Sequence, residues 1–150
     1  MPIDKCHYIT GGNNLPKVLK TNEMNKCIGC FTCMLICAAV NRNDHSIRKS
    51  CIHIRTTGGL SSKFVAIVCH ACHEPHCAEV CPAGALVPRK GGGVDLDPHR
   101  CIGCRRCVKA CMVHAVGFDS DEQKPIICHH CGSCVKFCPH GCLSMQPAQE

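Results

Sequence analysis

The sequence predicts a small α+β fold in which short helices and β-hairpins surround four sets of closely spaced cysteines. Three observations support this prediction. Nineteen of the 150 residues are cysteines, and sixteen of these fall into four sets. Short runs of β-forming residues, separated by glycines, lie between the sets. With no Trp, one Tyr and four Phe, the chain has few large apolar side chains for a core. We therefore expect bound metal to help hold the fold together.

The cysteine sets are defined by their spacing. Three follow C-x2-C-x2-C-x3-C, and the second set has two extra residues between its second and third cysteines. In chain order the sets are Cys27, Cys30, Cys33 and Cys37; Cys69, Cys72, Cys77 and Cys81; Cys101, Cys104, Cys107 and Cys111; and Cys128, Cys131, Cys134 and Cys138. Cys6, Cys51 and Cys142 belong to no set. Cys142 takes the place of Ala85 in a repeated Cys-Pro-x-Gly-x-Leu segment, so we expect a small buried residue there.

The segments between the sets predict three hairpins and several short helices. The hairpin strands are expected over 47–55 with 63–68, 85–88 with 94–96, and 115–118 with 125–127, turning at Gly58-Gly59, at the run of glycines 91–93 and at the polar residues 119–122. One or two helical turns are expected after each third cysteine, as over 32–40 and 105–110. Together these elements describe a ferredoxin-like α+β unit that is present twice.

The cysteine spacing indicates [4Fe-4S] clusters. A tight C-x2-C-x2-C loop can supply three thiolates to a cubane, and in two-cluster ferredoxins the last cysteine of each run binds the other cluster. Zinc is the alternative metal, but zinc sites favour two well separated C-x2-C pairs. Disulfides are disfavoured because the first residues lack the apolar run of a signal peptide, which makes a reducing cytoplasm the expected location. The longer loop of the second set leaves room for a different or more labile cluster.

Charge and motifs exclude several classes of function. The formal charge of +6 falls to about −2 once sixteen thiolates bind four cluster cores. With no arginine-rich run and almost no aromatic side chains to stack on bases, the chain is not expected to bind nucleic acid. The apolar stretches over 34–40 and 64–69 are too short to cross a membrane, so no direct membrane insertion is expected. No flavin, pterin or nucleotide fingerprint is present.

The histidines near the cysteine sets are expected to lie on the surface or beside the clusters rather than to bind metal. They are His70, His73 and His76 in the second set and His129, His130 and His140 in the fourth. A histidine that donates an N–H to a cluster sulfur raises the reduction potential of that cluster. We advance this role as a hypothesis for His73 and His130.

From residue 18 to residue 145 the chain resembles the four-cluster iron-sulfur subunits of the dimethyl sulfoxide reductase and formate dehydrogenase group. Its size is closest to the minimal members: the electron-transfer proteins of hydrogenase and carbon monoxide dehydrogenase, and the small subunit of tungsten-containing aldehyde oxidoreductases. The resemblance implies four [4Fe-4S] clusters that carry electrons, and no substrate chemistry. Larger members have added loops and sometimes a membrane tail that this chain lacks.

The resemblance also implies how the sets pair, the outer two with each other and the inner two with each other. It assigns Cys27, Cys30, Cys33 and Cys138 to cluster one; Cys69, Cys72, Cys77 and Cys111 to cluster two; Cys101, Cys104, Cys107 and Cys81 to cluster three; and Cys128, Cys131, Cys134 and Cys37 to cluster four. The inner unit, 57–114, is then inserted into an outer unit made of 18–56 and 115–150. Residues 1–17 are expected to form an N-terminal arm.

The expected function is that of a wire between a catalytic subunit and a second redox partner. On resemblance, the catalytic subunit is a tungsten or molybdenum pterin enzyme that oxidises aldehydes in anaerobic metabolism, and the second partner is a flavin-containing subunit or another electron acceptor. A hydrogenase or carbon monoxide dehydrogenase partner, or a free polyferredoxin, are the alternatives. Catalysis by this chain itself is not expected, because no cysteine set lacks a ligand to leave an exchangeable cluster site.

Overall fold

The structure, a computed structural model, describes residues 16–58 and 63–148. Its elements are short, as a chain folded around metal requires. In order they are β1 (Lys17–Lys20), η1 (Met24–Lys26), α1 (Thr32–Arg42), η2 (Ile47–Lys49), β2 (His53–Thr56), β3 (Phe64–Ile67), α2 (His76–Glu79), β4 (Leu86–Pro88), β5 (Val94–Leu96), α3 (Arg106–Ala110), β6 (Gly117–Asp119), β7 (Lys124–Ile126), α4 (Ser133–Lys136) and β8 (Ser144–Pro147). The fold is thus α+β, as predicted.

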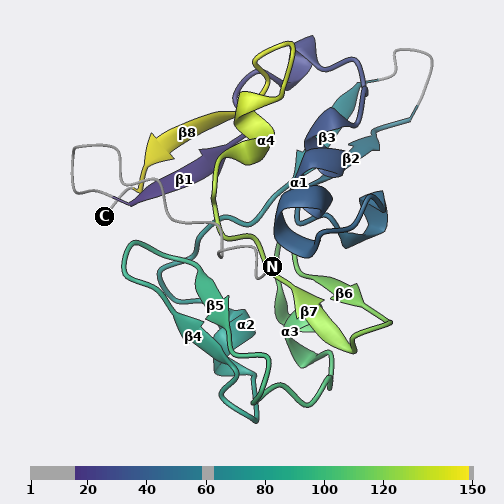
Figure 1. Cartoon of the computed structure of the whole chain (residues 1–150). Coiled ribbons are helices and arrows are strands. Elements are labelled where there is room, and N and C mark those ends of the chain that lie inside the picture. Colours follow the sequence, from purple (N-terminus) through teal and green to yellow (C-terminus); the bar gives the residue numbers. More distant parts are fainter. Residues whose placement is uncertain (1–15, 59–62, 149–150) are drawn as a thin grey trace.

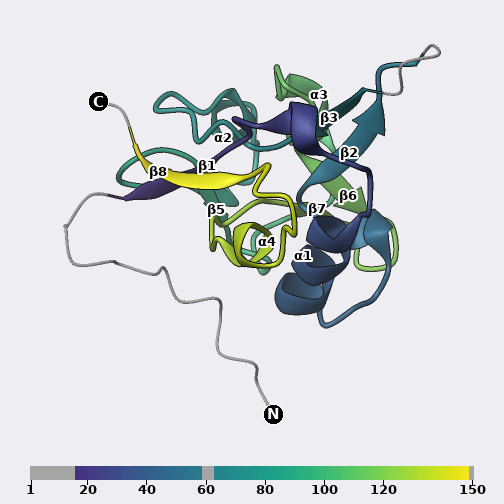
Figure 2. The ribbon, with the colours of Figure 1, turned by 90° about the horizontal axis from the view of Figure 1, so that it is seen from above.

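The strands form two-stranded antiparallel sheets: β1 with β8, β2 with β3, β4 with β5, and β6 with β7. The last three are the predicted hairpins, which are confirmed. The first pair was not predicted, because it joins the two ends of the described chain, with Lys17 opposite Pro147 and Lys20 opposite Ser144. In both ribbon views β1 and β8 lie side by side (Figures 1 and 2).

The elements gather into two groups (Figure 1). The upper group contains the β1–β8 and β2–β3 sheets with α1 packed against α4, and the lower group contains the other two hairpins with α2 packed against α3. Each group has its own small core. Six of the thirteen buried residues of the larger core are cysteines: Cys33, Cys37, Cys51, Cys128, Cys134 and Cys142. The interior is therefore built largely around thiols rather than large apolar side chains.

The predicted helical turns are confirmed, and α1 extends beyond the expected two turns to Arg42. One prediction is wrong. The start of the first expected strand, at Ile47–Lys49, forms the 3-10 turn η2 instead. The hydroxyl of Ser46 accepts a hydrogen bond from the Arg48 N–H at 3.4 Å, and Asp44 accepts one from the Ser46 N–H at 2.7 Å. These local side-chain bonds compete with strand pairing.

The glycine run in the β4–β5 turn allows a close approach between this hairpin and the second cysteine set. Gly92 has φ +93°, and a Cβ there would lie 2.0 Å from the carbonyl oxygen of Ala71. The next N–H, of Gly93, donates to the carbonyl of Cys72 at 3.0 Å. Only glycine fits a position that combines positive φ with backbone this close.

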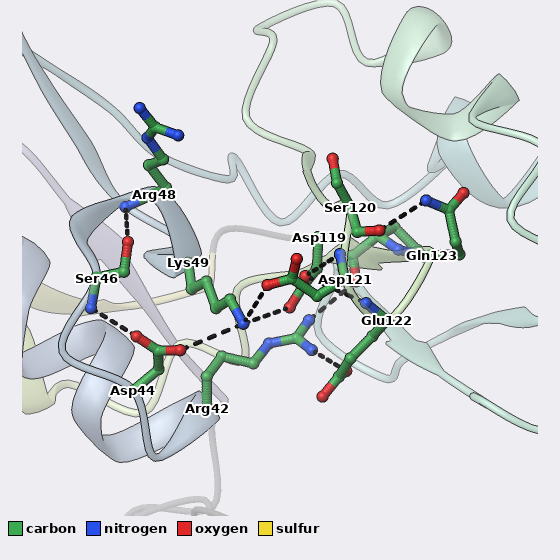
Figure 3. Close-up of polar contacts among 11 residues, drawn as sticks. Arg42, Asp44, Ser46, Arg48, Lys49, Asp119, Ser120, Asp121, Glu122 and Gln123 are labelled. Carbon is green, nitrogen blue, oxygen red and sulfur yellow. Dashed lines mark hydrogen bonds and ion pairs between the residues drawn. The ribbon is translucent and has the colours of Figure 1, made fainter.

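A group of ion pairs fastens the β6–β7 turn to the segment after α1 (Figure 3). The Lys49 ammonium lies 3.2, 3.5 and 3.1 Å from carboxylate oxygens of Asp44, Asp119 and Asp121. Beside it, Arg42 pairs with Glu122 at 3.1 Å and donates to the Pro125 carbonyl. The hairpin that follows the third cysteine set is thereby held against the helix that carries the first.

Some predictions fall on residues outside the described ranges. These predictions are most of the expected N-terminal arm, which includes Cys6, and Gly59, one of the two glycines of the first hairpin turn. Lys17, the last residue of that arm, is the first residue of β1.

Candidate metal centres

Three small cavities are each lined by four of the predicted ligand cysteines. One contains Cys27, Cys30, Cys33 and Cys138; a second contains Cys81, Cys101, Cys104 and Cys107; and a third contains Cys37, Cys128, Cys131 and Cys134. In each cavity, three cysteines come from one set and the fourth comes from a different set. These groupings have the same members as those implied by the family resemblance for clusters one, three and four.

The four remaining cysteines also lie near one another. Burial and the charges of Cys69 and Cys111 raise the pKa of Cys77 to about 11. Burial raises the pKa of Cys69 as well, and the charges of Cys72 and Cys111 add to this effect. Mutual repulsion of this kind requires short separations between thiolates. The four thiols thus act on one another, but Cys69 also acts on Cys128 of the fourth set, so their assignment to cluster two stays a prediction from the resemblance.

The first three cysteines of each set sit on a loop that enters a short helix. Phe31, Arg105 and Gly132, each two residues before the third cysteine of its set, have φ values of +57°, +61° and +75°. Left-handed residues next to right-handed ones turn successive N–H groups to the same side of the backbone, where they can bind an anion. The local sequence thus presents both thiols and amides to the metal centre.

The fourth cysteine of three sets accepts a backbone hydrogen bond from four residues later. The N–H groups of Ala85, Ala115 and Cys142 donate to the sulfurs of Cys81, Cys111 and Cys138 at 3.2, 3.3 and 3.4 Å. Such bonds stabilise a thiolate and influence the reduction potential of a bound cluster.

Cys37 is different, because α1 continues past it. Its sulfur accepts instead from the Cys51 N–H at 3.2 Å and the Asn41 side-chain amide at 3.5 Å. Hydrogen bonding with Cys51 lowers the pKa of Cys37 to about 6, against the effect of burial. The Cys51 thiol itself donates to the Ile127 carbonyl at 3.3 Å. Cys51, which the sequence left without a role, therefore supports a predicted ligand.

Cys142 has a similar place beside the first cavity. It is buried, as predicted, with 3% of its surface exposed, and it lines the cavity that contains Cys27, Cys30, Cys33 and Cys138. Burial and the hydrogen bond that its thiol donates to Cys138 raise the pKa of Cys142 to about 12. Its proton is therefore retained at neutral pH, and it acts as an S–H donor.

His130 provides a test of whether these cavities fit an iron-sulfur cluster. It is 5% exposed and lines the cavity of Cys37, Cys128, Cys131 and Cys134. Its Nδ1 accepts the Leu19 N–H at 3.0 Å, and burial lowers its pKa to about 4. The neutral ring therefore carries its proton on Nε2, which is buried and has no hydrogen-bond partner among the described residues. A buried donor on a residue that lines a cavity of thiols fits a cluster whose sulfurs accept hydrogen bonds.

The other histidines of the cysteine sets are more accessible. His70, His73, His76 and His140 are exposed. His129 is partly buried, with its Nδ1 3.6 Å from an Asp95 oxygen. The expectation of surface positions thus holds for four of them, and His130 is the buried exception.

Arg89 lies at the contact between the two groups of elements, a role that no sequence pattern indicated. The side chain is 10% exposed, and it donates to the carbonyls of His129 and Cys128 at 3.2 and 3.5 Å. It follows β4 in the lower group, whereas its acceptors belong to the fourth cysteine set. Its charge lowers the pKa of Cys69, although burial raises that pKa overall. Arg89 thus places a buried cation between cysteines of predicted clusters two and four.

The thiols in the described ranges are all free, so none of them forms a disulfide. In the same ranges, no group of three or more His, Cys, Asp or Glu side chains is arranged around a single metal ion. A cubane distributes its four thiolates over four iron atoms, farther apart than the ligands of one ion. No helix of the described chain has the length and apolar character needed to cross a membrane.

Comparison with known proteins identifies the kind of metal centre. Residues 100–143 match the family described as "4Fe-4S dicluster domain". The chain is 35% identical over 123 residues to the β subunit of NADH-dependent phenylglyoxylate dehydrogenase from Aromatoleum evansii, covering 79% of this chain and 28% of that subunit. It is 29% identical over 144 residues to the thiosulfate reductase electron transfer subunit PhsB of Salmonella typhi, covering 86% and 75% of the two chains.

A third relative matches over nearly its whole length. The Escherichia coli (strain K12) protein YsaA, whose name describes an electron transport protein, is 31% identical over 144 residues, which cover 85% of this chain and 88% of YsaA. The predicted iron-sulfur chemistry of the cysteine sets is thereby confirmed. The chain belongs to the family of iron-sulfur electron-transfer subunits that its sequence resembles, that of the dimethyl sulfoxide reductase group, and it is a non-catalytic subunit that binds [4Fe-4S] clusters.

Proposed function

We propose that the chain holds four [4Fe-4S] clusters and conducts electrons between a catalytic subunit and a second redox partner. The observation that carries this proposal is that cysteines of different sets line common cavities, four to a cavity. The ligands of each cluster are those assigned above from the resemblance. Each cluster takes up and releases one electron. Cysteines that serve as thiolate ligands suit a reducing compartment, and we infer the cytoplasm.

Electrostatic effects between thiols of different sets support a single order of clusters along the wire. The charge of Cys33, a ligand of cluster one, contributes to raising the pKa of Cys134, a ligand of cluster four, after burial and nearer thiols. In the same way Cys69 acts on Cys128, and Cys107 acts on Cys77. These pairs link cluster one to four, four to two, and two to three.

Clusters one and three are then the two ends of the wire. The ligands Cys30 and Cys104, one at each end, are exposed, as is Cys72 of cluster two. Since four clusters exceed what a mobile carrier needs, we infer that the chain is a fixed subunit of a complex. Its catalytic partner is a tungsten or molybdenum enzyme, aldehyde-oxidising by preference, on the family resemblance alone.

Elemental analysis of the native complex tests this function. The complex is isolated anaerobically through a tag on this chain, and iron, sulfide, tungsten, molybdenum and nickel are measured. We expect about sixteen iron atoms per copy of this chain beyond those of its partners, together with tungsten or molybdenum. Nickel in their place would favour hydrogenase or carbon monoxide dehydrogenase, and elution of the chain alone at its own mass would favour a free polyferredoxin. Zinc without sulfide would refute the proposal.

The pairing of sets has its own test in single ligand variants. Cys81→Ala is expected to perturb the same cluster as Cys104→Ala, because both residues line one cavity, and to leave the cluster perturbed by Cys72→Ala intact. Loss of one ligand should remove up to four of the sixteen iron atoms or leave a three-iron centre. Electron paramagnetic resonance of the three reduced variants makes the comparison. Identical spectra for Cys81→Ala and Cys72→Ala would contradict the pairing.

Cys142 is expected to raise the potential of cluster one through its S–H group. The positions equivalent to it beside clusters two and three are Ala115 and Ala85, which have no donor. Cys142→Ala should therefore lower one potential by roughly 40 mV if the lost bond is worth about 1 kcal/mol. Cys142→Ser should retain most of the effect. Redox titration followed by paramagnetic resonance measures all four potentials, and a uniform shift, or none, would contradict the role.

A further inference from the structure

The two ends of the proposed wire differ in charge. Residues 98–118, which contain the third cysteine set, include four basic residues and no Asp or Glu. Arg100, Arg105, Arg106 and Lys109 are all exposed, and we call these four side chains the basic face. In the described part of the chain, none of them forms an ion pair with a carboxylate.

These cations surround the cavity of Cys81, Cys101, Cys104 and Cys107. The Arg105 guanidinium lies 4.1 Å from the centre of the Phe118 ring, which lines that cavity. Arg106 and Lys109 line an open hollow beside Cys81, together with one carboxylate, that of Glu79, which lies 2.8 Å from His76 Nδ1. The Arg100 guanidinium covers Gly84, where a Cβ would lie 2.8 Å from Nη2. The exposed ligand Cys104 and Ile102, which is 68% exposed, complete the surface.

The end at Cys30 has no such excess of charge. There Glu23 and Lys26 neutralise each other at 3.2 Å. The large exposed side chains at this end are apolar: Ile28 is 63% and Phe31 is 40% exposed. Exposed apolar side chains are present at both ends, since Ile102 is 68% and Met112 is 78% exposed in and beside the third cysteine set. The two ends therefore differ in charge, and a surface with unpaired charge suits a partner that binds and leaves.

The four cations of the basic face are not needed to balance the negative charge of the thiolate-bound clusters. A cation already lies among the predicted ligands of clusters two and four, since Arg89, 10% exposed, donates to the Cys128 carbonyl and acts on Cys69. The four cations of the basic face instead keep their charged groups in water. Exposed charges at this density act over about a Debye length, roughly 8–10 Å at physiological salt, and speed the encounter with a partner of opposite charge.

We propose that the basic face docks a small, acidic, one-electron carrier protein, which exchanges electrons with the cluster held by Cys81, Cys101, Cys104 and Cys107. The proposal rests on the proposed function and adds to it which end of the wire meets the exchangeable partner. One electron passes in each encounter, so one centre is oxidised as the other is reduced, and no bond is made or broken.

Stopped-flow kinetics of the full-length holoprotein test the docking. The probe is an acidic flavodoxin, whose semiquinone absorbance is distinct from that of iron-sulfur clusters. Electron transfer is measured in both directions, since one of them must be downhill. The test variant is Arg106→Glu with Lys109→Glu. The matched control is Arg48→Glu with Lys136→Glu, which makes the same change of charge at exposed positions away from the basic face.

At low salt the test variant is expected to lower the second-order rate constant at least ~10-fold, and the control less than ~2-fold. Added salt should slow the wild type toward the test variant. Cytochrome c, a basic carrier, should not be slowed by the test variant. A milder variant, Arg106→Gln with Lys109→Gln, should be intermediate, and iron content equal to wild type shows that each variant is folded.

Three results would overturn the docking proposal alone: equal slowing by test and control variants, a wild-type rate independent of salt, or loss of the permanent partner subunits from the test variant during purification. The last result would assign the basic face to the catalytic complex. Absence of iron and sulfide from the wild-type chain would be distinct, because it would refute the proposed function and the docking with it.

Discussion

Removal of iron is expected to abolish the cooperative thermal unfolding of this protein. Its sheets have only two strands each, a size that is marginal in isolation. The largest fully buried apolar side chains are Ile52, Ile126 and Val94, too few to replace a conventional core. Four of the six cysteines in the larger core are predicted cluster ligands. Metal binding is therefore expected to supply most of the folding free energy. The free energy of unfolding of a typical domain is about 5–15 kcal/mol.

Circular dichroism and calorimetry of anaerobic holoprotein and chelator-treated, thiol-reduced protein measure this effect. The holoprotein should show one or more sharp transitions and the apoprotein a gradual slope. Ferrous iron with sulfide should restore the transition, whereas zinc without sulfide should not. A cooperative transition in the metal-free chain would show that the polypeptide folds by itself and that this account of the core is wrong.

The elements that the sequence predicted are those with local signals. The β4–β5 hairpin follows from β-forming residues on both sides of three glycines, and α1 from the apolar run after Cys33. The β1–β8 sheet had no such signal, since its strands lie more than a hundred residues apart and each has only four residues. The strand expected at Ile47–Lys49 failed because hydrogen bonds of Ser46 and Asp44 stabilise a turn there.

The same difference between local sequence signals and long-range contacts applies to the metal centres. The ligand cysteines could be predicted because the spacing of thiols on a tight loop is itself a local property. The supporting groups could not, because they reach the cysteines through the fold. Arg89 approaches Cys128 across 39 residues of sequence, and Leu19 meets His130 across 111. Such distant contacts leave no periodicity in a single sequence.

His130 is the supporting group with the largest expected effect on a single potential. Because the Leu19 N–H fixes Nδ1 as an acceptor, the ring can donate only from Nε2, and that atom is buried at the cavity of cluster four. A donor to sulfur stabilises the reduced, more negative cluster more than the oxidised one, and so raises its potential.

His130→Leu keeps much of the side-chain volume and removes the donor. The potential of cluster four should fall by tens of millivolts, since 59 mV corresponds to a tenfold change for one electron, while the other three potentials stay within error. The variant also leaves the Leu19 N–H without its acceptor, which should cost about 1–3 kcal/mol of stability. Redox titration and thermal unfolding measure the two effects separately.

His73→Leu is the matched control. His73 belongs to the second cysteine set but is exposed, so its replacement should change neither the potentials nor the unfolding temperature appreciably. Four unchanged potentials in His130→Leu, with full iron content, would show that Nε2 does not donate to the cluster. Equal shifts of the reduction potential in both variants would instead attribute the effect to a general loss of polarity near the cysteines. Water stabilises the reduced cluster at an exposed site, just as a buried N–H does at an enclosed one.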